Sequence, residues 1–135
     1  MEMLDVQKAK QECERLEDVW KVLSDATGAL KSRGVNVPSD IYTSLRGAKV
    51  LINLCKTYPR LEDLTPGDVD AHAGYCVGCC GADVVTRIRC ELRNIEDLLV
   101  ITATNELGSK FALELQEKTK KIWEPAKTAI VGAAG

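Results

Sequence analysis

One segment of this 135-residue chain concentrates the residue types that bind metals or act as nucleophiles. Residues 72–90 hold the only histidine and four of the six cysteines. Thiolate sulfur and imidazole nitrogen are the ligands that zinc prefers, and thiolates hold iron–sulfur clusters. The candidate ligands are His72, Cys76, Cys79, Cys80 and Cys90. The sequence therefore predicts that a zinc or iron–sulfur site, if the protein has one, lies in this segment.

Two arrangements of this segment are open. In the first, residues 76–81 form a turn, and the Cys-x-x-Cys pair with its following glycine makes half of a metal site. No second Cys-x-x-Cys or His-x-x-x-His pair follows, so Cys13 and Cys55 are the only cysteines outside the segment that could complete it. In the second, the segment is helical, and Gly74 and Gly78 let another helix approach closely. The missing second pair favours this structural interpretation.

Hydrophobic spacing predicts that helices position the segment. Apolar residues recur at alternating spacings of three and four, and no stretch alternates with the period of two that a strand requires. Glycine and proline separate the periodic stretches. The predicted helices cover residues 4–33, 38–58, 66–107 and 109–124, with a tail over 125–135. The sequence predicts an all-α single domain over residues 1–135, in which a long antiparallel helical hairpin packs with a long third helix and a shorter fourth.

The longest apolar seam is compatible with two assemblies. It runs through residues 4–33 in heptad spacing and includes Trp20 and Leu23, which we expect to be buried. One interpretation is a coiled coil between two chains. The other is an amphipathic helix inside an intramolecular bundle, which uses the same packing geometry. The bundle is the favoured interpretation.

A helical wheel over residues 68–102 separates an apolar face from a charged one. The apolar face of its second half consists of Val85, Ile88, Leu92, Ile95 and Leu99. The charged side chains between these positions are expected to be solvated and paired with one another. They are Arg87, Arg89, Glu91, Arg93, Glu96 and Asp97.

Composition and charge bear on partners and location. The net charge is −2, and positive and negative residues are interspersed, so neither nucleic acid nor an anionic membrane is an expected partner. The N-terminal stretch has no apolar core of a signal peptide, and the apolar runs are too short to cross a bilayer. A cytoplasmic protein is expected, and its cysteines are predicted to be thiols or metal ligands rather than a disulfide framework. Intracellular proteins of hyperthermophiles are the exception.

Residues 44–58, Ser-Leu-Arg-Gly-Ala-Lys-Val-Leu-Ile-Asn-Leu-Cys-Lys-Thr-Tyr, carry a resemblance. Together with the preceding helix, they resemble small all-helical archaeal proteins of a domain of unknown function, found in methanogens and their relatives. The resemblance implies a cytosolic helical bundle without an assigned activity, and it transfers no site residue.

The chain lacks a glycine-rich phosphate loop, a Ser-His-Asp set and a His-Glu-x-x-His motif. No cofactor is expected outside the cysteine segment. The predicted function is therefore that of a non-enzymatic structural or protein-interaction module that self-associates as a homodimer or larger oligomer. The alternative is a metal-binding protein (zinc or iron–sulfur) or a redox-thiol protein centred on residues 72–90.

Overall fold

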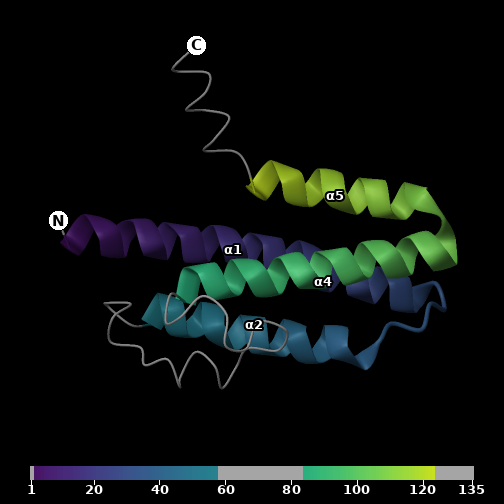
Figure 1. The fold of residues 1–135 in the computed structure, drawn as a ribbon, viewed down its shortest axis with the longest axis horizontal. Helices are drawn as coiled ribbons and strands as arrows, with labels where there is room; N and C mark the ends of the chain where they lie inside the picture. Colours follow the sequence, from purple (N-terminus) through teal and green to yellow (C-terminus); the bar gives the residue numbers. More distant parts are fainter. Residues whose placement is uncertain (1, 58–83, 124–135) are drawn as a thin grey trace, which may run out of the picture.

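The computed structural model describes residues 2–57 and 84–123, which form helices and two short connections and contain no strand. The helices are α1 (Glu2–Ser32), α2 (Ser39–Thr57), α4 (Val84–Leu107) and α5 (Ser109–Trp123). They pack against one another in a bundle (Figure 1). The prediction of an all-α helical bundle is confirmed.

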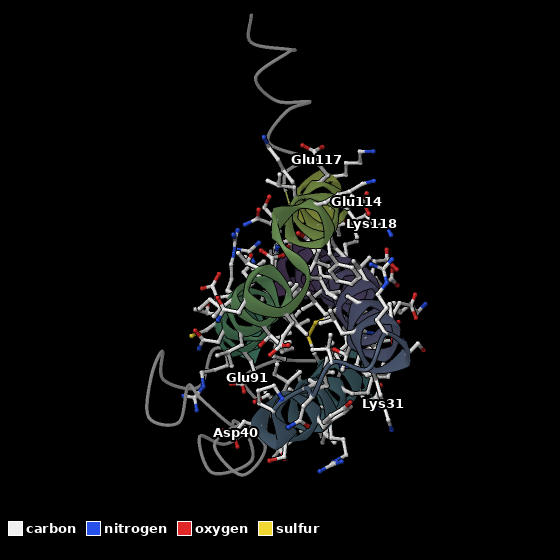
Figure 2. The ribbon with its side chains drawn as sticks, turned by 90° about the vertical axis from the view of Figure 1, so that its right-hand side faces the viewer. Lys31, Asp40, Glu91, Glu114, Glu117 and Lys118 are labelled. Carbon is white, nitrogen blue, oxygen red and sulfur yellow. A yellow bond between two sulfur atoms is a disulfide. The ribbon has the colours of Figure 1, made fainter. Side chains whose placement is uncertain are left out.

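The bundle has a three-helix centre with a fourth helix laid across one side. Helices α1, α2 and α4 contact one another in all three pairs, whereas α5 packs on α1 and α4 (Figure 1). Helices α1 and α2 form the predicted antiparallel hairpin. The end-on view in Figure 2 places α5 and α2 on opposite sides of the bundle. This arrangement makes α1 and α4 the helices that every other described helix contacts.

The heptad seam of α1 is buried inside its own chain. Leu16, Leu23 and Leu30 are fully buried, and each buried leucine stabilises the fold by about 1.5–3 kcal/mol. Trp20 is half-buried, and its Nε1 donates a hydrogen bond to the carbonyl oxygen of Leu45, at 2.7 Å, which joins α1 to α2. Over these residues the seam forms the core of a bundle, as the favoured interpretation predicts, and is not exposed for a second chain.

Two glycines end helices through left-handed backbone conformations. Gly34 has φ of 81°, its N–H donates to Lys31, and the N–H of Val35 donates to the carbonyl of Leu30 at 3.0 Å. These bonds define a Schellman motif, and Val35 and Leu30 both belong to the hydrophobic core. Gly108 has φ of 86° and separates α4 from α5. Both helix ends match the predicted positions.

The apolar face of α4 is the predicted one. Ile88, Leu92, Ile95 and Leu99 are fully buried, and Val85 packs against the core. The predicted third helix spans residues 66–107, and its first part lies outside the described residues, together with the tail over 125–135. None of the described helices combines the length and apolarity that crossing a membrane requires.

Candidate functional site

Most of the predicted metal ligands cannot be placed. His72, Cys76, Cys79 and Cys80 lie outside the described residues. Cys90 lies on α4, is half-buried and is disulfide-bonded. A disulfide sulfur is not a thiolate, so Cys90 could serve as a ligand only after reduction. The zinc or iron–sulfur site therefore stays a prediction, which elemental analysis of anaerobically purified protein tests.

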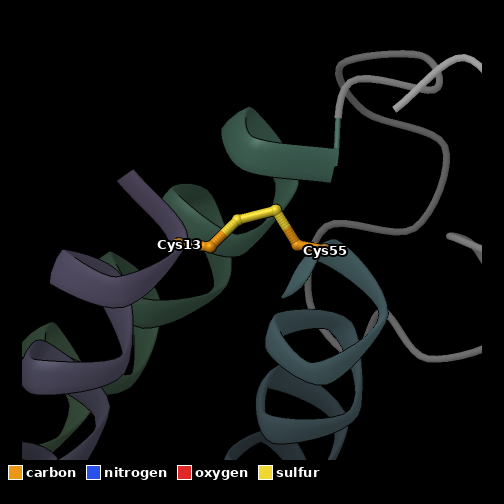
Figure 3. The surroundings of a disulfide bond; sticks show 2 residues. All are labelled: Cys13 and Cys55. Carbon is orange, nitrogen blue, oxygen red and sulfur yellow. A yellow bond between two sulfur atoms is a disulfide. The ribbon is translucent and has the colours of Figure 1, made fainter. Parts of the chain in front are cut away.

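The two remaining cysteines form a disulfide rather than thiols or metal ligands. Cys13 of α1 and Cys55 of α2 are bonded, with a Cα–Cα distance of 6.4 Å that lies within the usual range (Figure 3). The sequence analysis favoured thiols or metal ligands for these residues, and the structure corrects it. The physical reason is the antiparallel hairpin, which places the beginning of α1 beside the end of α2. Both residues are buried.

The charged residues of α4 are more buried than predicted. Arg87, Glu91 and Glu96 are buried, although the sequence analysis placed them in solvent. The reason is that α4 packs against α1, α2 and α5, so positions beside its apolar stripe are also covered. Arg87 and Glu91 each have an interaction partner, and the Glu96 carboxylate accepts a hydrogen bond from Trp123 Nε1 at 3.3 Å.

The exposed arginines of α4 contact neighbouring helices instead of the acidic residues predicted for them. Arg89 forms an ion pair with Glu12 of α1 at 2.7 Å. The Arg93 guanidinium lies 4.3 Å from the centre of the Trp123 ring on α5. A cation over an aromatic face stabilises the contact by about 0.5–1 kcal/mol at an exposed site. These contacts hold α4 in place between its neighbours, and we assign them a structural role.

On the side of α1 that faces α2, the Glu17 carboxylate forms ion pairs with two lysines. Glu17 accepts hydrogen bonds from Lys49 at 2.7 Å and from Lys56 at 3.0 Å. The Lys49 bond and then the Lys56 bond favour the ionised carboxylate and lower the pKa of Glu17 from 4.5 to about 2. This cluster connects α1 to α2 and places two lysine charges around one carboxylate.

The other side of α1 borders a solvent-accessible groove. It lies between α1 and α5 and has a volume of about 250 Å³. Its lining residues are Val22, Asp25, Ala26, Ala29, Phe111, Glu114, Leu115 and Lys118. The groove exists because α5 rests on both α1 and α4, while α1 presents small alanine side chains at this point. Among its apolar members, Val22, Ala29 and Phe111 are half-buried, and Ala26 and Leu115 are buried.

Three charged residues line the α1–α5 groove. Asp25, Glu114 and Lys118 are exposed, and within the described part of the chain none of them forms an ion pair. Figure 2 shows Glu114 and Lys118 leaving α5 on the same side. At one end, the Arg33 guanidinium lies 5.4 Å from the centre of the Phe111 ring. The groove thus combines an apolar surface with charges that are free to pair with a ligand.

Sequence reasoning missed the α1–α5 groove. The sequence signal for the groove is the pair of alanines Ala26 and Ala29. Small side chains beside the apolar seam of α1 leave space that a neighbouring helix does not fill. Which helix faces them depends on the packing of α5, and the sequence pattern does not specify that packing. No group of three or more histidine, cysteine, aspartate or glutamate side chains lies close enough to hold a metal ion within residues 2–57 and 84–123.

Comparison with known proteins identifies no relative: no family model, no curated protein and no solved structure matches this chain. The resemblance of residues 44–58 to small archaeal helical proteins therefore stays a prediction.

Proposed function

We propose that this protein is a non-enzymatic interaction module that binds a short peptide segment in the α1–α5 groove. The observation that supports the proposal is an accessible apolar surface bordered by charges without ion-pair partners among the described residues. The volume of about 250 Å³ is below the range of about 300–1,000 Å³ that is usual for small-molecule sites. A groove of this size suits a few side chains of an extended or helical peptide.

The lining residues specify the chemistry of the peptide. Val22, Phe111 and Leu115 favour apolar side chains, and the alanines of α1 leave room for them. Asp25 and Glu114 can pair with a lysine or arginine of the ligand, whereas Lys118 and, at one end of the groove, Arg33 carry the opposite charge. Exposed ion pairs contribute only about 0.2–1 kcal/mol each. The apolar contacts therefore provide most of the affinity, and the charges select the orientation of the peptide.

The test is a titration with two short acetylated peptides of alanine and leucine, one with a central lysine and one with glutamate in its place. Binding is followed by the ring resonances of Phe111, which are easily assigned because the chain has a single phenylalanine. The lysine peptide is expected to bind more tightly than the glutamate peptide, and Asp25→Asn with Glu114→Gln should abolish the difference. Glu117→Gln is the matched control, because Glu117 is exposed on α5 but does not line the groove.

The titration is run on the wild-type chain. If the lysine peptide does not shift the ring resonances of Phe111, the proposed function is wrong. Self-association, which the sequence also predicts, uses a separate test: light scattering of the wild-type chain should show a dimer or larger species, and a monomer would contradict that part of the proposal.

A further inference from the structure

We propose that the α1–α5 groove binds helix α5 of a second copy of this chain, so that two copies form a twofold-symmetric dimer. The inference rests on the proposed function, because it takes the groove as the binding surface and names its occupant. In this dimer the two α5 helices run antiparallel, and each lies against the groove of the other copy. An outside peptide then competes with dimer formation.

The bundle leaves one side of α5 uncovered. Ala112, Leu115 and Thr119 are buried, and α5 packs on α1 and α4. Glu114 and Lys118 are exposed, lie about 40° apart around the helix and leave α5 together on the side of the groove (Figure 2). Neither of them forms an ion pair among the described residues. This side of α5 is therefore open to a second helix.

The order of the charges along α5 makes this helix complementary to itself. The acidic residues Glu114 and Glu117 precede the basic residues Lys118 and Lys121. When two α5 helices run antiparallel, the acidic part of one lies opposite the basic part of the other. A twofold axis near Gln116 places Glu114 opposite Lys118 of the partner subunit, and the symmetry repeats this pair. A parallel pair would place like charges opposite one another, so the charges favour a second copy in the antiparallel orientation.

The same pairing covers the accessible aromatic ring of the groove. Phe111 is half-buried and lies five residues before Gln116, so it faces Lys121 of the partner subunit, which lies five residues after Gln116. A lysine covers apolar surface with its methylene groups while its ammonium group stays in water. Helix α5 has 15 residues and is about 22 Å long. A contact of this length is smaller than a stable interface of about 1,200–2,000 Å², so the dimer is expected to dissociate at micromolar concentration.

The experiment reverses single charges and measures the dissociation constant of the dimer by analytical ultracentrifugation over a range of concentrations. Glu114→Lys and Lys118→Glu each place like charges opposite one another twice, so each should weaken the dimer by at least about tenfold. An equal mixture of these two variants restores both opposite-charge pairs and should form a heterodimer as readily as the wild type dimerises. Glu117→Lys and Lys120→Glu are the matched controls, because they make the same charge changes at exposed α5 positions that do not line the groove. The controls should change the constant much less.

Three results would overturn the inference: a wild-type chain that stays monomeric at millimolar concentration, single variants that dimerise like the wild type, or a mixture in which the two variants stay monomeric. A titration of the Lys118→Glu chain with the alanine–leucine–lysine peptide separates this inference from the proposed function, because that chain keeps Asp25 and Glu114 in the groove. Peptide binding together with an unaffected dimer means that the inference is wrong and the proposed function stands. If the peptide does not shift the ring resonances of Phe111 in this chain, the proposed function is wrong, and the mixing experiment still decides whether the dimer forms.

Discussion

The Cys13–Cys55 disulfide should make a large contribution to the stability of the described bundle. It joins α1 to α2 across a sequence separation of 42 residues (Figure 3). In the chain-entropy description, closing a loop of this length lowers the entropy of the unfolded chain enough to stabilise the fold by about 4 kcal/mol at about 25 °C. Replacing both residues, Cys13→Ala and Cys55→Ala, removes this constraint together with two buried sulfur atoms.

The assay separates these two effects. Urea unfolding is followed by far-ultraviolet circular dichroism for the wild type and the double variant, each with and without a reductant. The loss of buried sulfur is common to both conditions, and reduction of the Cys90 disulfide affects both chains alike. The free energy of unfolding should therefore differ between the chains by about 4 kcal/mol more without reductant than with it. If the two chains differ in free energy of unfolding by the same amount with and without reductant, the disulfide does not stabilise the fold.

Two further perturbations test the helix ends and the ion cluster. Gly28 lies inside α1 with open space around it, so Gly28→Ala should stabilise the fold by about 0.5–1 kcal/mol. Gly34 has φ of 81°, so Gly34→Ala should destabilise the fold. Thermal unfolding should show a higher midpoint temperature for the first variant and a lower one for the second. The pKa of Glu17 is lowered from 4.5 to about 2, so its contribution to stability is complete above pH 4.5 and is lost as the pH falls towards about 2. In Glu17→Gln, the free energy of unfolding should depend less on pH over that interval. The same dependence on pH in the variant and the wild type would contradict the lowered pKa of Glu17.

The helices could be predicted from sequence because their signals are local. The seam around Trp20 and Leu23 repeats over many turns, and a glycine follows α1 at the position that needs a positive φ. Gly108 acts in the same way between α4 and α5. These features depend on residues within a few positions of one another, and hydrophobic spacing together with helix-end chemistry is sufficient to find them.

The contacts between helices could not be predicted, because they depend on register and on the number of neighbours. The Cys13–Cys55 pairing requires knowing which turn of α1 faces which turn of α2. The burial of Arg87 and Glu91 requires knowing that α4 has three neighbours, since a wheel shows only the width of the apolar stripe. The α1–α5 groove requires the position of α5 over Ala29 and its neighbours, which no pattern within α1 contains.

The most direct test of peptide binding in the groove is the affinity of the lysine peptide after a larger side chain has been introduced into the groove wall. Ala29→Leu, in an otherwise wild-type chain, adds a branched side chain to the groove wall. Gly28→Ala in the same chain is the control, because Gly28 is exposed on the neighbouring position of α1 and does not line the groove. A peptide-binding groove predicts that Ala29→Leu weakens binding by at least about tenfold, as expected for the loss of one buried apolar contact, while Gly28→Ala leaves it unchanged. Unaltered affinity in the Ala29→Leu chain would show that the peptide binds elsewhere and would contradict the proposed function.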